Sequence, residues 1–182
     1  MNDTTLDVFT VPLPPGSRAT RFYPEPNLAD AYAVRLPAGA THDPEVLARF
    51  MFAQQAPWVA RLLWLRDTLV SAVGLKTTRQ LLAASDSAPV PRVAFFRIYA
   101  QDAHEILLGE DDSHLDFRVT VRCEPLAGTT GATQLIVSTV VKCHNALGRF
   151  YIAVIAPWHR LVVRSALRRA ARAGWPAQEN RP

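Results

Sequence analysis

The turn GEDDSHLD is the first of three stretches whose side chains could do chemistry. It holds a group of acids and one histidine: Glu110, Asp111, Asp112, His114 and Asp116. Oxygen-rich ligands suit calcium or magnesium, but the DxDxDG spacing of a calcium loop is absent. Such acids more often accept hydrogen bonds from backbone N–H groups of a hairpin loop and pair with nearby arginines, here Arg118 or Arg122. We favour that structural interpretation and predict no metal and no cofactor.

The second stretch is the polar corner at His144-Asn145, followed by Arg149. A histidine that titrates near neutral pH can act as a general acid or base, so His144 is the candidate catalytic residue. A structural role is the favoured account, because Asn145 suits the N-cap of a helix and His144 can bond the backbone beside it. His159 and Arg160 could line the same space or extend toward solvent.

The third stretch is AFFRIYA, in which Arg97 and Tyr99 share one face of a strand. An inward Arg97 would anchor an acidic ligand, whereas an outward one would be ordinary surface. Nucleophilic catalysis finds little support, since the sequence has no GxSxG elbow. Cys143 and His144 are adjacent on a strand, so their side chains point to opposite faces and form no dyad.

These side chains must be positioned by a run of strands and a long helix. Alternation and apolar runs predict strands at residues 30–36, 93–100, 105–108, 115–124 and 134–144. Short polar connections between the last four predict antiparallel hairpins. The stretch from 135 to 172 is an apolar strand that passes directly into a long helix. We therefore expect a sheet curved around that helix, with a cavity between them.

Helix boundaries are marked by proline, aspartate and glycine. Asp43 is the expected N-cap of a helix that starts at Pro44, and a second helix starts at Pro57 and stops at Gly74. Pro157 lies inside the long helix, where a proline removes a hydrogen bond and costs about 3 kcal/mol unless the helix kinks. A kink or break is expected there.

Pairing in the last hairpin follows from its turn. If GTTG centres that turn, Cys123 lies opposite Leu135 or Gln134, and Cys143 lies near Leu115. The two thiols are then at opposite ends of the strand pair, so we expect no disulfide. Alternation from Leu115 to Cys123 predicts one buried face and one wet face.

Length and composition bound the organisation of the chain. Its 182 residues fit one domain. We predict an irregular proline-rich arm over 1–29, a single domain over 30–173 and a flexible tail over 174–182. The first residues lack the features of a secretory signal, so a cytoplasmic location is expected.

The net charge of +4 is concentrated near the C-terminus, after residue 159. Arginines there match the negative end of a helix dipole, which accounts for them without any partner. Their attraction to an anionic membrane surface is an alternative. Nucleic acid is not expected as a partner, because no aromatic residues for base stacking are interleaved with the arginines. Charged residues and Pro157 break the apolar part of the helix, so it is not a membrane span.

Four segments together resemble the bacterial domain-of-unknown-function family 2867. They are DAYAV, PWVARLLWLRDTLVSAVGLK, EILLGEDDSHLDFRVTV and VVKCHNALGRFYIAVIAPWHRLVV, and the resemblance covers about residues 28–170. The family in turn resembles the START-like (SRPBCC, helix-grip) superfamily, which includes polyketide cyclases and lipid-transfer domains. The resemblance implies that fold and small-molecule metabolism, but no activity.

We therefore expect an α+β helix-grip protein that binds a small, largely apolar molecule beneath its C-terminal helix. The expected ligand-binding residues are Arg97, Tyr99, Phe117, Arg118, His144, Arg149, Tyr151 and Trp158. Further lining or core candidates are Phe95, Phe96, Val119 and Phe150. One alternative is an enzyme of the polyketide cyclase type that uses His144 or a carboxylate, and another is a peripheral membrane module. The sequence leaves the ligand and the oligomeric state open.

Overall fold

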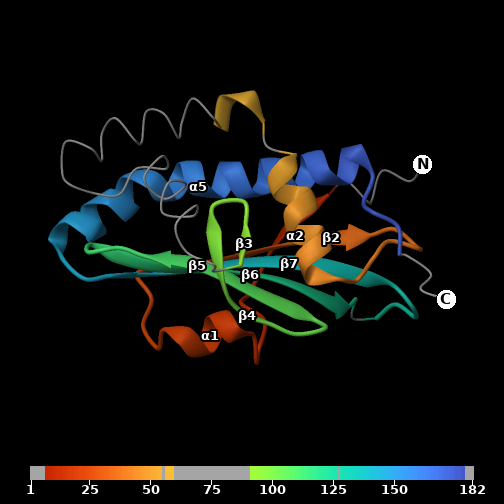
Figure 1. Cartoon of the computed structure of the whole chain (residues 1–182), viewed down its shortest axis with the longest axis horizontal. Helices are drawn as coiled ribbons and strands as arrows, with labels where there is room; N and C mark the ends of the chain where they lie inside the picture. Colours follow the sequence, from red (N-terminus) through yellow and green to blue (C-terminus); the bar gives the residue numbers. More distant parts are fainter. Residues whose placement is uncertain (1–6, 55, 60–90, 127, 179–182) are drawn as a thin grey trace.

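The structure is a computed structural model that describes residues 7–54, 56–59, 91–126 and 128–178. In chain order its elements are β1 (Val8–Val11), α1 (Arg18–Phe22), β2 (Leu28–Leu36), α2 (Pro44–Ala53), β3 (Arg92–Val93), β4 (Phe96–Gln101), β5 (Glu105–Asp111), β6 (Leu115–Pro125), β7 (Thr133–Cys143) and α5 (Ala146–Ala173). Figure 1 shows the sheet in the middle, with the long helix α5 on one side and α1 on the other.

Within the described residues, seven strands form one antiparallel sheet in the order β1-β2-β7-β6-β5-β4-β3. The predicted fold class, a curved antiparallel sheet with a long C-terminal helix, is confirmed. The predicted register is also confirmed, because Cys123 pairs with Leu135 and Cys143 pairs with Leu115. Both cysteines are free and buried, at opposite ends of the β6–β7 pair.

Several parts of the chain differ from the prediction. The start of the tail expected over 174–182 packs on the domain, because Trp175 is buried and Ala177 forms a β-bridge with Ala40. The single strand expected over 93–100 is two strands, because the chain turns at Ala94, whose φ is +53°. The arm expected to be irregular contains β1 and α1 (Figure 1), and β1 extends the sheet by pairing with β2. Its prolines hide this strand, since Val8–Val11 is a short edge strand placed just before them.

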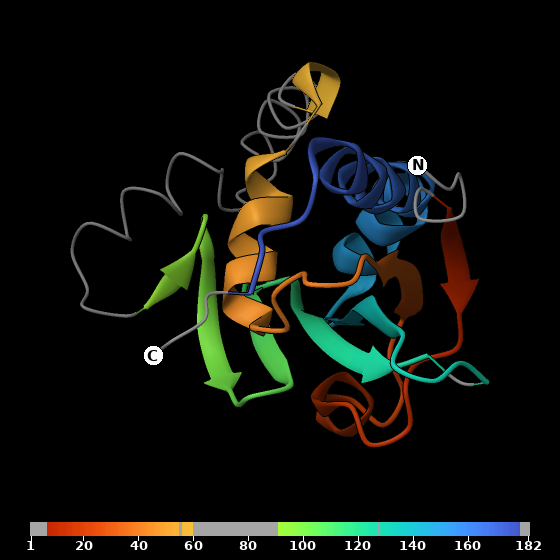
Figure 2. The same cartoon turned by 90° about the vertical axis from the view of Figure 1, so that its right-hand side faces the viewer.

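The two faces of the sheet have different covers. Helices α2 and α5 lie on the concave side, which we call the inner face, and α1 lies on the other side, the outer face (Figure 2). The main core packs on the inner face, where Leu47 and Met51 of α2 and Leu167 of α5 meet strand residues such as Val121 and Val137.

Capping residues set where α2 and α5 begin, as predicted. The Asp43 carboxylate accepts hydrogen bonds from the backbone N–H groups of Glu45 and Val46, and Asn145 Oδ1 accepts one from Gly148. Helix α5 continues through Pro157, so the predicted break is absent. A bend remains, because Figure 1 shows the first turns of α5 inclined to the rest.

The predicted helix from Pro57 to Gly74 falls mainly outside the described residues. Pro57 to Val59, at its start, are helical. None of the helices that the structure describes is both long and apolar enough to cross a membrane.

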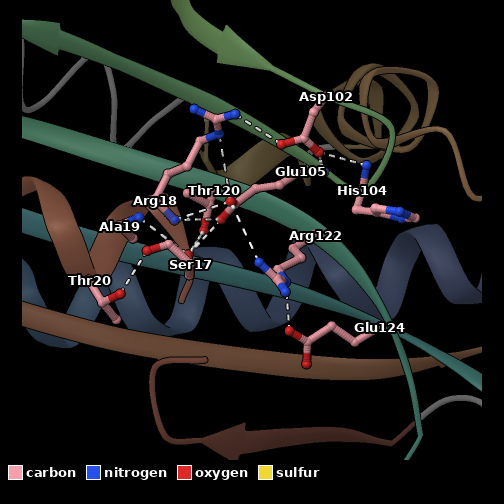
Figure 3. A network of polar contacts seen from close by, with 10 residues as sticks. All are labelled: Ser17, Arg18, Ala19, Thr20, Asp102, His104, Glu105, Thr120, Arg122 and Glu124. Carbon is pink, nitrogen blue, oxygen red and sulfur yellow. Dashed lines mark hydrogen bonds and ion pairs between the residues drawn. The ribbon is translucent and has the colours of Figure 1, made fainter. Parts of the chain in front are cut away.

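A buried polar network fastens the N-terminal segment to the outer face (Figure 3). The Ser17 hydroxyl donates to Glu105 Oε1 at 2.6 Å, and the backbone N–H of Arg18 donates to both oxygens of that carboxylate. Arg122 Nη1 lies 3.7 Å from Glu105 Oε2. The Glu105 side chain is only 3% exposed, so these donors compensate a buried charge.

This network corrects the predicted wet face of β6. Arg118 and Thr120, on its polar side, are 3% and 0% exposed. Alternation along β6 correctly separates polar from apolar side chains, but it carries no information about the N-terminal segment that covers the polar side.

We predict that Ser17→Ala lowers the free energy of unfolding by about 1–3 kcal/mol, because it removes both a donor to a buried carboxylate and the N-cap of α1. Ser138→Ala is the matched control, since the Ser138 side chain is also buried but its Oγ has no hydrogen-bond partner among the described residues. Urea unfolding of both variants measures the difference. Equal losses would contradict the role given to Ser17.

Candidate functional site between the sheet and helix α5

Two apolar clusters lie side by side between the inner face and α5. The main cluster contains the C-terminal half of the helix, with Ala166, Leu167 and Ala170, and most of the inner strand residues. The small cluster consists of Leu28, Leu115, Val141 and Cys143, against which Tyr151, Ile152 and Ala156 pack. On β2 and β7 a row of polar side chains lies between the two clusters, whereas Phe117 of β6 packs against both.

Strand β2 contributes Asp30 to this row. Inner-face residues recur at every second position, and Asp30 comes between Leu28 of the small cluster and Tyr32 of the main cluster. Its cross-strand neighbour on β7 is Thr139, which is 4% exposed. A carboxylate thus interrupts an otherwise apolar strip of the sheet.

Helix α5 contributes His159 from the opposite side. His159 lies one turn after Ala156, which packs on the small cluster, and one turn before Val163, which packs on the main cluster. Its Nε2 lies 3.2 Å from Asp30 Oδ1, within hydrogen-bonding distance. Asp30, Thr139 and His159 form what we call the polar row.

The environment of Asp30 is buried but incompletely satisfied. Its side chain is 8% exposed. Arg160 Nε lies 3.8 Å from Oδ2, which is too far for a hydrogen bond, and that arginine side chain is 56% exposed. Among the described residues Oδ2 has no hydrogen-bond partner. One carboxylate oxygen therefore remains able to accept a hydrogen bond in a site closed to bulk water.

Tyr32 and Arg164 complete the surroundings of the polar row. Tyr32 is 3% exposed, and burial, together with the Asp30 charge, raises the pKa of its phenol, which therefore stays protonated at neutral pH. The charges of Arg160 and Arg164 act on the pKa of the same phenol in the opposite direction. Arg164 Nε is buried and, in the described part of the chain, also lacks a hydrogen-bond partner.

The Asp30–His159 pair has the composition of an acid–base couple. A carboxylate hydrogen-bonded to an imidazole fixes the orientation of the ring. The same pair can instead hold the polar end of a bound molecule. Both uses need only these two side chains and the unsatisfied Asp30 oxygen.

Three of the predicted ligand-binding residues lie on the outer face, away from this site. Arg97 and Tyr99 alternate with Phe96 and Ile98, which pack on the main cluster, so both point outward. The guanidinium carbon of Arg118 lies 3.8 Å from the Tyr99 ring centroid. Of the two orientations considered for Arg97, the structure shows the outward one, in which the side chain belongs to the ordinary protein surface.

Arg118 is enclosed by aromatic rings and acids beneath α1. Its guanidinium carbon lies 4.4 Å from the ring centroid of Phe22, and its Nη2 donates to Asp111 Oδ1 at 2.7 Å. Tyr99 donates to Asp111 Oδ2. Burial raises the pKa of Tyr23 and of Tyr99 to about 12, and the hydrogen bond to Asp111 adds to the effect at Tyr99. These contacts anchor α1 to the sheet.

The remaining predicted site residues are divided between surface and interior. His144 has an exposed side chain (42%) that pairs with Asp116 at 3.0 Å, and Arg149 is exposed beside it. Trp158 is 51% exposed and Phe150 is 68% exposed. The half-buried inner-face residues are Phe96, Phe117 and Tyr151, and Val119 is buried there. His144 is therefore not brought to the polar row.

The acidic turn has the predicted structural role. Asp111 pairs with Arg118, Asp116 Oδ1 accepts from the backbone of Asp112, and Asp112 Oδ1 accepts from that of Ser113. Over the residues that the structure describes, no three His, Cys, Asp or Glu side chains are grouped to hold a metal ion.

The sequence indicated His159 and Arg160 as candidates, whereas Asp30 and Thr139 were not predicted. The signal for Asp30 was present, because DAYAVRL alternates and places Asp30 on the face of Tyr32 and Val34. A charged residue in register with a core face is the pattern that indicates a buried polar site. Thr139 had no comparable signal.

Comparison with known proteins gives one match. The family model described as "Protein of unknown function (DUF2867)" matches residues 22–166, which is most of the chain, so this chain belongs to that family. All the residues of the polar row fall inside the matched segment, whereas Ser17 precedes it. Neither a curated protein nor a solved structure matches the chain.

We predict that His159→Leu lowers the free energy of unfolding by about 2 kcal/mol, because it leaves the buried Asp30 carboxylate without its hydrogen bond. The double variant Asp30→Leu/His159→Leu should recover most of this loss, since replacing both partners of a buried pair by apolar groups is nearly neutral. Urea unfolding of the single and double variants measures the coupling. Strictly additive losses would show that the two side chains do not interact.

Alkaline pH should weaken the attachment of α1. Tyrosines ionise near pH 10 in an unfolded chain but near pH 12 at Tyr23 and Tyr99, so unfolding releases protons between these values. Stability is therefore retained below about pH 10 and lost as the pH rises toward 12. Tyr99→Phe removes one such group and should reduce the slope of unfolding free energy against pH. An unchanged slope would contradict this assignment.

Proposed function

We propose that this member of the DUF2867 family binds a small, largely apolar molecule between the inner face of its sheet and helix α5. The polar end of the molecule contacts the Asp30–His159 pair, and its apolar body lies along the two clusters. The observation that carries the proposal is the buried Asp30 carboxylate with one unsatisfied oxygen on an otherwise apolar strip. Binding sites for small molecules typically combine apolar walls with a few convergent polar groups.

The packing of α5 supports the same placement. Its fully buried residues are Gly148 near the start and Ala166, Leu167 and Ala170 near the end. Between them, the turns around His159 hold only half-buried or exposed residues. Helix α5 is thus buried most deeply near its two ends and only half-buried in the middle, where the polar row lies.

The proposal includes membership of the START-like, helix-grip superfamily and work in the cytoplasm. The order of strands and the long closing helix support the first, as a helix-grip-like arrangement. The two free, buried thiols fit the second, because cytoplasmic thiols stay reduced.

A catalytic role of the polyketide cyclase type is the second candidate. It requires an ionisable side chain on the inner face, and Asp30 with His159 meets that requirement where His144 does not. In this case the imidazole moves a proton on the bound molecule while the carboxylate orients the ring. A turnover assay comparing His159→Leu with His144→Leu would separate the two histidines.

Binding is tested with the neutral dye N-phenyl-1-naphthylamine, whose fluorescence rises in apolar surroundings. We expect saturable enhancement at micromolar protein. Ala156→Trp, which fills space against the small cluster, should weaken binding by about tenfold or more, whereas Ala153→Trp, on an exposed position of the same helix, should change it by less than about twofold. No saturable enhancement, or equal effects of both variants, would refute the proposal.

A further inference from the structure

From the unsatisfied atoms around the polar row, we infer that the ligand presents a neutral hydroxyl group, as a phenol, enol or alcohol does. The hydroxyl donates its proton to Asp30 Oδ2 and accepts a hydrogen bond from Arg164 Nε. This inference rests on the proposed function and specifies the chemical class of the ligand. It follows from counting donors and acceptors on the inner face.

The acceptor is Asp30 Oδ2. Its partner oxygen, Oδ1, is engaged by His159, and the nearest cation, Arg160 Nε, lies 3.8 Å away. A side chain that is more than nine-tenths buried cannot obtain its hydrogen bond from bulk water. A ligand atom bound at Oδ2 must therefore carry a hydrogen, because a carboxylate oxygen only accepts.

The donor is Arg164 Nε, which is buried without a hydrogen-bond partner among the residues described. Arg164 lies one helical turn after Arg160, whose Nε is 3.8 Å from Asp30 Oδ2, so the two arginines share the side of α5 that faces Asp30. A guanidinium N–H only donates, and so it requires an acceptor. A single hydroxyl supplies a donor and an acceptor on one atom.

Other polar groups suit this pair less well. A ligand carboxylate would accept from Arg164 but would place a second negative charge beside Asp30, where low dielectric strengthens the repulsion. An ether would leave Asp30 Oδ2 unsatisfied. Arg97, which would have anchored an acidic ligand had it pointed inward, lies on the outer face against Tyr99. Arg118, an expected ligand-binding residue, also lies there and pairs with Asp111.

Three naphthalene probes of nearly equal size test the inference by isothermal titration calorimetry at pH 7. 2-Naphthol donates and accepts, 2-methoxynaphthalene only accepts, and 2-naphthoate is an anion. We expect 2-naphthol to bind about tenfold more tightly than either of the others, the usual value of a hydrogen bond to a buried charge. Binding of all three within about twofold, or tightest binding of 2-naphthoate, would overturn the inference.

Two variants test whether Asp30 causes the preference for 2-naphthol. Asp30→Leu should reduce the ratio of 2-naphthol to 2-methoxynaphthalene affinity to within about twofold, because it removes the acceptor. Glu124→Gln, which removes a carboxylate on the outer face, should leave the tenfold ratio intact. A ratio that Asp30→Leu leaves unchanged would overturn the inference.

The same binding measurements test the proposed function and the hydroxyl inference separately. Saturable binding of N-phenyl-1-naphthylamine without a preference for 2-naphthol would refute the hydroxyl inference and leave the proposed function standing. Absence of saturable binding by every probe would refute both. If Asp30→Leu does not fold, the comparison of the three probes on the unmodified chain still decides the inference.

Discussion

The buried carboxylate of Asp30, facing His159 of helix α5, is the interaction on which the account of this protein depends. A charge removed from water costs several kcal/mol unless hydrogen bonds and opposite charges compensate it. Here compensation comes from the middle of α5, so the hydrogen-bonded pair joins the sheet to the helix between the two apolar clusters. Because one oxygen stays unsatisfied, the pair is incomplete within the described residues.

The outer face shows why this site stands apart from the other polar groups. Glu105 and Arg118 are also buried charges, but each is surrounded by partners from the N-terminal segment and neighbouring strands (Figure 3 for Glu105). Their contacts hold α1 and its N-cap residue Ser17 on the sheet. On one side the sheet is thus closed by a polar network in which Glu105 and Arg118 each have several partners. On the other side it is closed by an interface in which Asp30 Oδ2 has no hydrogen-bond partner among the described residues.

The fold was more predictable from sequence than the site. Alternation and capping residues such as Asp43 and Asn145 act locally, so they predicted the strands of the hairpins, the register of Cys123 and the start of α5. Whether a side chain belongs to the site depends on which face of the sheet another helix or segment covers. Arg118 was predicted to contact the ligand because nothing local showed that α1 encloses it. The inward position of Asp30 could have been predicted, because the alternation of residues 30–36 places it on the core face.

The most direct test of the central claim is a methyl-labelled NMR titration of the protein with N-phenyl-1-naphthylamine. Binding between the inner face and α5 predicts that the methyl signals of Val141, Ile152 and Val163 shift together along one saturation curve, because these residues flank the polar row. Ile136, which packs on the outer face with Ala31 and Ala33, should not shift. Shifts confined to Ile136, or saturable binding that leaves the three inner-face residues unperturbed, would contradict the account.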